Sequence, residues 1–181
     1  TLLTEPELLR ELPAAAALPT DYAKVFKYSS LARIRRGNVS GTVLAANTTF
    51  FSFRKGAAVL EAVRLASAFF GKGQFVGGGL EIREGRYVLR QELEGPYFQP
   101  LTKEQIAAGD HVRLAPHGTL TLASRAARVR SNVQLYEAVI TVTETSGKFM
   151  LVISIDGTKD VPLAVELAFR RGAKLEGVEP V

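Results

Sequence analysis

The sequence predicts an all-β protein: an antiparallel β-sandwich preceded by a short N-terminal helix or linker. Three observations support this fold class. After residue 21, β-branched and aromatic residues alternate with polar ones in short runs. Turns that contain Gly separate these runs at short intervals. The apolar runs of the last third follow one another with no helix between them, as in antiparallel rather than parallel sheets.

Composition sets the outer limits of the prediction. A chain of 181 residues with 46% hydrophobic content is long enough for one sizeable core. It has no run of roughly 18 apolar residues, so we expect no membrane span. The absence of cysteine excludes disulfides and thiolate metal sites. The net charge of +5 is moderate and acids are mixed in, so an acidic polymer fits as a partner and nucleic acid is not expected.

The first residues differ from the rest. Residues 1–21 combine leucines with Glu5, Glu7 and Glu11 at helical spacing, followed by four alanines between Pro13 and Pro19. We expect an amphipathic helix and a Pro/Ala linker, with a single sandwich domain over residues 22–181. Because the sequence begins at Thr1 without a Met or a signal-like segment, we also expect a fragment or a processed product.

The first half of the sandwich contains a predicted hairpin. The runs 31–36 and 39–45 flank the turn Gly37-Asn38, and 50–54 forms the next strand. Residues 57–70 fit both the helical and the strand period, and we favour a strand.

The second half contains a second hairpin and the clearest strands. The runs 80–83 and 87–94 flank Glu84-Gly85-Arg86. Residues 102–108 are expected to form a single helical turn. Three apolar strands follow, at 133–144, 149–156 and 161–169.

One stretch of the chain is strongly cationic. Between Tyr22 and Leu60 there are seven basic residues and no Asp or Glu: Lys24, Lys27, Arg33, Arg35, Arg36, Arg54 and Lys55. Such a stretch predicts a surface that attracts an anion. Arg33 and Arg35 share one strand face and could clamp an anion, or they could form an ordinary solvated sheet face.

The run 50–54 is the densest mixture of aromatic and charged residues. Phe51 and Phe53 are predicted to face the core, whereas Phe50 and Arg54 share the other face. Phe50 beside Arg54, followed by Lys55, could stack on a sugar and pair with its carboxylate or sulfate. The alternative is a buried strand whose end is capped by solvated charges.

No catalytic motif stands out. The two histidines, His111 and His117, fit no compact metal motif, and Gly77-Gly78-Gly79 lacks the Lys and Ser/Thr of a phosphate loop. We therefore expect no cofactor, no metal and no catalytic residue within this chain.

Three segments together resemble a known family. NTTFFSFRKG at 47–56, VRLASAFFGKGQF at 63–75 and VPLAVELAF at 161–169 look like the carboxy-terminal β-sandwich region of heparinase II/III-like bacterial proteins. The resemblance covers roughly residues 22–177. It implies an α/α-toroid domain upstream, which holds most of the family's catalytic residues, and a periplasmic or secreted location. It also implies that Asn47 and Arg54 are secondary glycan contacts.

These observations lead to one functional prediction with two alternatives. We expect a non-catalytic β-sandwich domain of a larger polysaccharide-active protein, which supports a catalytic domain and contacts anionic glycan. The expected contacts are Arg33, Arg35, Asn47, Phe50, Arg54 and Lys55. The alternatives are a self-contained polysaccharide lyase or hydrolase, and a structural or protein-interaction module without glycan affinity.

Overall fold

A computed structural model describes residues 16–107, 128–174 and 176. Most of the predicted N-terminal helix, at residues 1–15, lies outside this part of the chain, as do His111 and His117. Among the described helical residues, no stretch is long and apolar enough to cross a membrane.

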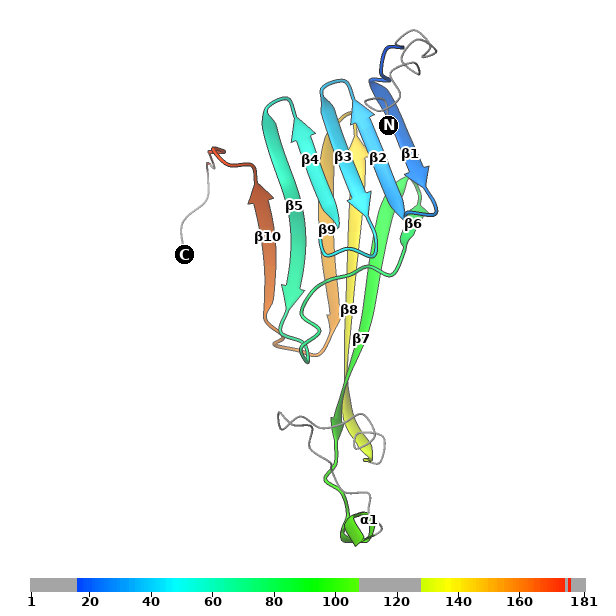
Figure 1. Cartoon of the computed structure of the whole chain (residues 1–181), viewed down its shortest axis with the longest axis vertical. Helices are drawn as coiled ribbons and strands as arrows, with labels where there is room; N and C mark the ends of the chain where they lie inside the picture. Colours follow the sequence, from blue (N-terminus) through cyan, green and yellow to red (C-terminus); the bar gives the residue numbers. More distant parts are fainter. Residues whose placement is uncertain (1–15, 108–127, 175, 177–181) are drawn as a thin grey trace, which may run out of the picture.

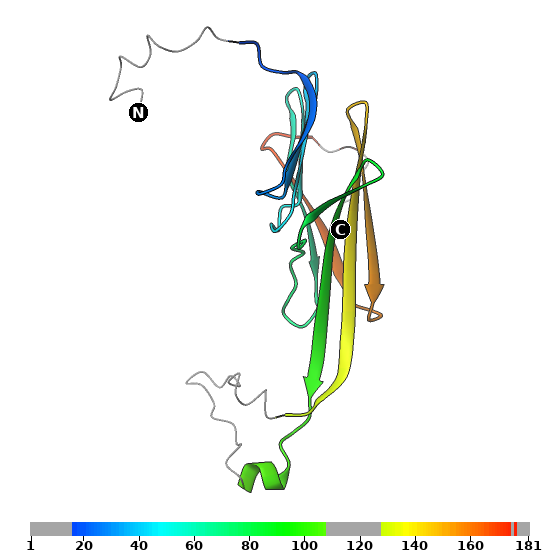
Figure 2. The same cartoon turned by 90° about the vertical axis from the view of Figure 1, so that its right-hand side faces the viewer.

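The described chain forms two antiparallel sheets packed face to face, which confirms the predicted all-β sandwich (Figures 1 and 2). The larger sheet has the order β1-β2-β3-β4-β5-β10 and the smaller one β6-β7-β8-β9. The strands of the larger sheet are β1 Asp21–Phe26, β2 Leu31–Arg36, β3 Val39–Leu44, β4 Phe51–Lys55, β5 Ala58–Ser67 and β10 Leu163–Phe169. Those of the smaller sheet are β6 Leu80–Arg83, β7 Arg86–Phe98, β8 Arg130–Thr145 and β9 Lys148–Gly157.

The predicted strands are confirmed with small shifts at their ends. The ambiguous residues 57–70 contain strand β5, as favoured, and the expected helical turn is α1, Lys103–Ala107. The connection predicted as Glu84-Gly85-Arg86 is one residue shorter, because Arg86 already belongs to β7. Glu84 and Gly85 have φ angles of 51° and 75°, which is the backbone of a tight two-residue hairpin turn.

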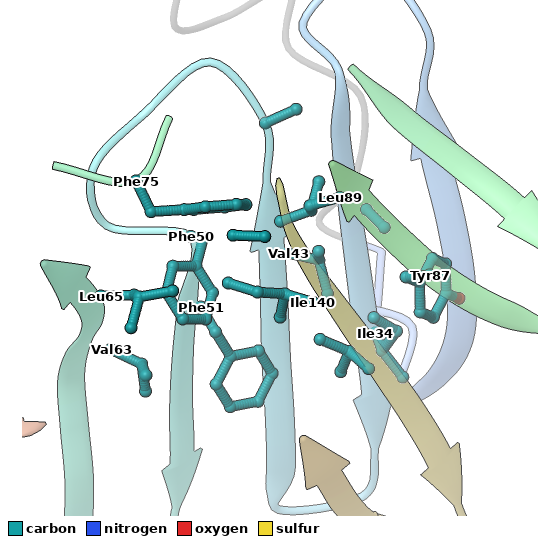
Figure 3. Packing of buried hydrophobic residues seen from close by; sticks show 14 of the residues in the cluster. Ile34, Val43, Phe50, Phe51, Val63, Leu65, Phe75, Tyr87, Leu89 and Ile140 are labelled. Carbon is teal, nitrogen blue, oxygen red and sulfur yellow. The ribbon is translucent and has the colours of Figure 1, made fainter. Parts of the chain in front are cut away.

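Alternate residues of the strands fill the space between the sheets. The larger sheet contributes Ile34, Val43 and Phe51, and the smaller sheet contributes Leu89 and Ile140 (Figure 3). All of these side chains are almost completely shielded from solvent. The strand period of two therefore decides which side chains enter the core and which face outward.

An aromatic contact joins β9, at the edge of the smaller sheet, to β4, in the interior of the larger sheet. The ring of Phe149, on β9, lies 5.4 Å from the ring of Phe51 and 5.7 Å from that of Phe53, measured between centroids. Across from it is Gly41, where a Cβ would lie only 2.6 Å from a ring carbon of Phe149. Because Gly41 has no side chain, the ring of Phe149 can pack against the backbone of β3 at this point.

Two tyrosines belong to this core. Burial raises the pKa of the Tyr87 phenol, and the nearby Glu144 carboxylate raises it further, while Arg36 lowers it. Burial also raises the pKa of Tyr136, against the effect of a hydrogen bond with Ser67. Both phenols are therefore held in the uncharged form more strongly than in the unfolded chain.

Strands β7 and β8 continue beyond the sandwich as a two-stranded ribbon, with α1 at its far end (Figures 1 and 2). Glycine is required where β9 ends beside this ribbon. Gly157 has a φ of 124°, and a Cβ there would lie 2.8 Å from the carbonyl carbon of Leu135.

Gly157→Ala is therefore expected to destabilise the fold by about 2–4 kcal/mol, because the backbone of β8 cannot move aside and the φ angle disfavours a side chain. Urea denaturation measures this loss. Gly79→Ala is the matched control, since Gly79 has open space around its Cβ position. Equal stability of the two variants would show that the close approach of β9 to β8 is not required.

We also expect the free energy of unfolding to fall at alkaline pH. The pKa of Tyr87 and of Tyr136 is raised in the folded protein. Their contribution to the free energy of unfolding is therefore complete below the ordinary tyrosine pKa of about 10, and it is lost as pH rises through the folded-state pKa. Urea denaturation at pH 8 and pH 11 should show a smaller loss for the double variant Tyr87→Phe/Tyr136→Phe than for the wild type. Tyr28→Phe, at an exposed site, is the control, and an identical loss in all three proteins would contradict the prediction.

Candidate functional site

The register of three strands brings arginines together on the outer face of the larger sheet. Arg35 pairs with Ser40, and Ser40 pairs with Arg54. Directly paired residues lie on the same face, so Arg35 and Arg54 are separated only by the width of β3, about 10 Å between their backbones. In the next row of the same face, Arg33 pairs with Thr42.

A shallow hollow of about 270 Å³ lies beside Arg33 and Arg54, and Arg35 lies outside its lining. Its polar lining consists of Arg33, Ser40, Ser52, Arg54 and Glu61. Guanidinium groups and hydroxyls beside each other can donate several hydrogen bonds to one carboxylate or sulfate group. We call Arg33, Arg35 and Arg54, with the hydroxyls of Ser40, Thr42 and Ser52, the arginine face.

Short contacts orient the three arginines without neutralising them. The guanidinium of Arg33 donates a hydrogen bond to the Thr42 hydroxyl. The Nε of Arg35 donates to the carbonyl oxygen of Gly37 at 3.1 Å, and the Nε of Arg54 donates to that of Gly56 at 3.0 Å. Within residues 16–107, 128–174 and 176, none of the three forms an ion pair.

Two acidic side chains of the described chain are engaged by arginines outside the arginine face. Glu61, at the rim of the hollow, pairs with Arg170 at 3.3 Å. Glu166 pairs with Arg64. The positive potential of the arginine face is therefore only partly offset by its surroundings.

Strand β1 extends the arginine face by two residues that were not among the glycan contacts expected from the sequence. Tyr22 pairs with Arg35 and Lys24 pairs with Arg33, so both lie on the same side of the sheet. Lys24 lies over the ring of Phe26, with its Nζ 5.2 Å from the ring centroid. The alternation of residues 21–26 indicates that Tyr22 and Lys24 share one strand face. Their pairing with Arg35 and Arg33 on β2 could not be predicted from the sequence.

The structure separates the other predicted contacts from the arginine face. Phe50 is buried in the core with 0% exposure, edge-on to Phe75, so the predicted pairing of Phe50 with Arg54 on one outer face is wrong. The physical reason is that Phe50 precedes β4 and does not follow its alternation. Lys55 lines a hollow with Phe53 and Phe149 on the core-facing side of the larger sheet. Its side chain therefore does not share the outer face with Arg54.

Asn47 is also apart from the arginines. It lies in the loop before β4, while Arg54 lies near the end of that strand. Its side-chain oxygen accepts a hydrogen bond of 2.9 Å from the backbone N–H of Thr49. This contact shapes the loop and gives Asn47 a local structural role.

Not every cation of the acid-free stretch faces outward. Arg36 forms ion pairs with Glu144 at 2.9 Å and with Asp21 at 3.2 Å, and so links the larger sheet to β8 of the smaller one. Glu144 also accepts a hydrogen bond of 2.7 Å from the backbone N–H of Gly147. The stretch therefore supplies both a link between the sheets and an external cationic surface.

Other charged groups of the described chain are less suited to binding. On the smaller sheet, Arg90 is paired with Glu92 and Glu137, and Arg130 with Glu94, so these arginines are neutralised locally. Among the described residues, no group of three or more His, Cys, Asp or Glu side chains is arranged to hold a metal ion. The arginine face remains the best-formed candidate site in this part of the chain.

Comparison with known proteins gave no match: no protein family, no curated protein and no solved structure resembles the chain at a significant level. The geometry of the arginine face is therefore the basis on which a function can be proposed.

Neighbouring arginines should differ in their effect on stability. Arg36→Gln leaves the mostly buried Glu144 carboxylate without its ion pair, and we expect a loss of about 1–3 kcal/mol. Arg35→Gln removes the same charge from the outer face and should change stability by less than about 0.5 kcal/mol. Thermal and urea denaturation of both variants measure the difference, and similar losses would show that Arg36 does not link the sheets.

Proposed function

We propose that this β-sandwich is a non-catalytic domain of a larger polysaccharide-active protein and that its arginine face contacts an anionic glycan. The observation that supports the proposal is that Arg33, Arg35 and Arg54 share one sheet face, without ion pairs among the described residues, and that Arg33 and Arg54 line a hollow together with two serines. The planar guanidinium group matches the geometry of carboxylate and sulfate groups. An open, shallow site of this kind suits a chain-like ligand that lies across several strands.

The spacing of the arginines also fits a polymer. Two rows of cations and hydroxyls run across the strands, and Tyr22 and Lys24 continue these rows onto β1. Acidic groups repeated along a polysaccharide can meet successive cations of such rows, so several weak contacts act together. The parent protein is proposed to be of the heparinase II/III-like type, with the sandwich supporting an upstream catalytic domain.

The arginine face predicts charge-dependent glycan binding. Heparin, polygalacturonate and neutral dextran, titrated against the 181-residue chain at 20 mM and 200 mM salt, separate anionic from neutral recognition. We expect binding of one or both anionic polymers, weakened by about tenfold or more at the higher salt because screening shortens the range of the charges. Dextran should not bind.

A triple variant locates this binding. Arg33→Gln/Arg35→Gln/Arg54→Gln should weaken it by about tenfold or more, since each exposed contact contributes up to about 1 kcal/mol. Arg83→Gln/Arg86→Gln/Arg130→Gln removes the same charge from the smaller sheet and should have a much smaller effect. Equal losses would assign the binding to net charge alone and overturn the arginine face as a site.

The same polymers test the non-catalytic part of the proposal. Cleavage by a lyase would release unsaturated sugars, which are followed by their ultraviolet absorbance. Sustained release by the purified chain would favour the alternative of a self-contained lyase. Absence of binding to every anionic polymer at low salt would instead favour a protein-interaction module, an alternative supported by the large exposed apolar side chains of β10.

A further inference from the structure

Strand β10 exposes an apolar face that is continuous with the core. Leu163, Val165, Leu167 and Phe169 are 47%, 53%, 52% and 36% exposed. Val165 pairs with Leu65, and Leu167 pairs with Val63, on the neighbouring strand β5. Both partners are buried at 2% exposure, so the exposed side chains of β10 lie on the side of the sheet that faces the interior of the sandwich.

The cause of this exposure is the unequal width of the two sheets. The larger sheet has six strands and the smaller sheet has four, and β10 stands at the edge of the larger one (Figure 1). Opposite to it, β9 is the last strand of the smaller sheet, and among the described residues no strand pairs with its second edge. The described strands therefore leave one strand position beside β9, facing β10, unfilled.

The space between these two strands is hollow. A cavity of about 470 Å³ is lined by Phe51, Phe53, Leu60, Val63, Phe149, Leu151 and Leu167, together with Gly147, Lys55 and Lys148. A second hollow of about 380 Å³ shares Phe53 and Leu60 with the first. We call the exposed face of β10, the core-facing side of β9 and these two hollows the β9–β10 notch.

The charged residues that line the β9–β10 notch are all cations, and one of them, Arg170, is paired with Glu61 outside the lining. The lining of the two hollows includes five cations and no Asp or Glu: Lys55, Lys148, Arg170, Arg171 and Lys174. These cations come from the end of β4, the start of β9 and the segment after β10, which lie at the same end of the sandwich (Figure 1). At the other end, residues 158–162 connect β9 to β10 and limit the notch.

We propose that the β9–β10 notch binds an extended, acidic segment of a partner polypeptide, which adds to β9 as a fifth strand of the smaller sheet. The free edge of β9 supplies main-chain hydrogen bonds, as in other cases of strand addition. Alternate apolar residues of the segment cover Val165 and Leu167. Its Asp or Glu residues meet the cationic rim, which selects an acidic partner over a neutral or basic one.

The 470 Å³ cavity of this docking surface lies on the core-facing side of the larger sheet, whereas the arginine face lies on the outer side. The second hollow, of about 380 Å³, reaches the border between the two sides and shares Phe53, Val59 and Leu60 with the hollow of the arginine face. Because the variants chosen below lie in or beside the 470 Å³ cavity, failure of peptide binding and failure of glycan binding are distinguishable. A glycan is a poor match for the notch, whose lining is mainly apolar. An extended polypeptide satisfies both the free strand edge and the apolar surface.

Labelled peptides test the proposal on the 181-residue chain. The probe is a nine-residue peptide with Glu at the odd positions and Val or Leu at the even ones, followed by fluorescence anisotropy. We expect it to bind about tenfold or more tightly than a peptide of the same composition with its apolar residues in one block, because only the first matches the strand period. Replacement of Glu by Lys in this peptide should abolish binding. N-methylation of those alternate backbone amides of the peptide that would face β9 should also abolish it.

Variants of the chain locate the site. Val165→Lys and Leu167→Lys, both at exposed positions, should weaken peptide binding by about tenfold or more, because a charge enters the apolar surface. Val152→Lys, at an exposed position on the outer face of β9, is the matched control and should bind as the wild type does. Lys55→Glu/Lys148→Glu should reverse the preference, so that the Lys peptide binds better than the Glu peptide.

Three outcomes would overturn the proposal. Equal binding of the N-methylated peptide would exclude strand addition. Equal loss in Val152→Lys and Val165→Lys would place the peptide outside the notch. The third outcome is that no peptide binds and that the wild-type chain forms a concentration-dependent dimer, which Val165→Lys dissociates. The occupant would then be a second copy of this chain. Circular dichroism of each variant confirms that the β-sheet signal is retained.

Discussion

Burial of alternate strand residues between the two sheets is the constraint on which the other features depend. Because Ala32 and Ile34 are held in the core, Arg33 and Arg35 must face outward. The same rule, applied to β3 and β4, turns Ser40 and Arg54 to the outer side. Antiparallel pairing then aligns these residues across the sheet. The arginine face is therefore a direct consequence of how the core is packed.

The arginines divide into two classes by their position relative to the core. Arg36 reaches toward the smaller sheet and is matched by Glu144 and Asp21, so its charge serves the fold. Arg33, Arg35 and Arg54 face away from the core, and their contacts are with a hydroxyl and turn carbonyls. A charge that contributes little to stability is free to contribute to binding, which is why the external arginines, and not Arg36, carry the proposed glycan contact.

The unequal width of the sheets gives the molecule a second, chemically different surface. The arginine face is polar and cationic, whereas the β9–β10 notch is apolar and cationic only at its rim. An exposed apolar strand edge is a hazard for aggregation in a protein that stands alone. The two proposals together describe a domain that holds a polymer on one face of the larger sheet while a neighbouring polypeptide completes the sandwich from the other.

The sequence by itself determined the all-β class, both tight hairpins and the positions of nearly all strands, because turn residues and the period of two are local properties. It also indicated Arg33, Arg35 and Arg54. Only the tertiary structure decided that these three share a face with Ser40 and Ser52, since the register between strands depends on long-range pairing. For the same reason it alone placed Phe50 in the core and Lys55 at the notch. The position beside β9 that the described strands leave unfilled follows from the strand order, which arises only when the whole sandwich packs.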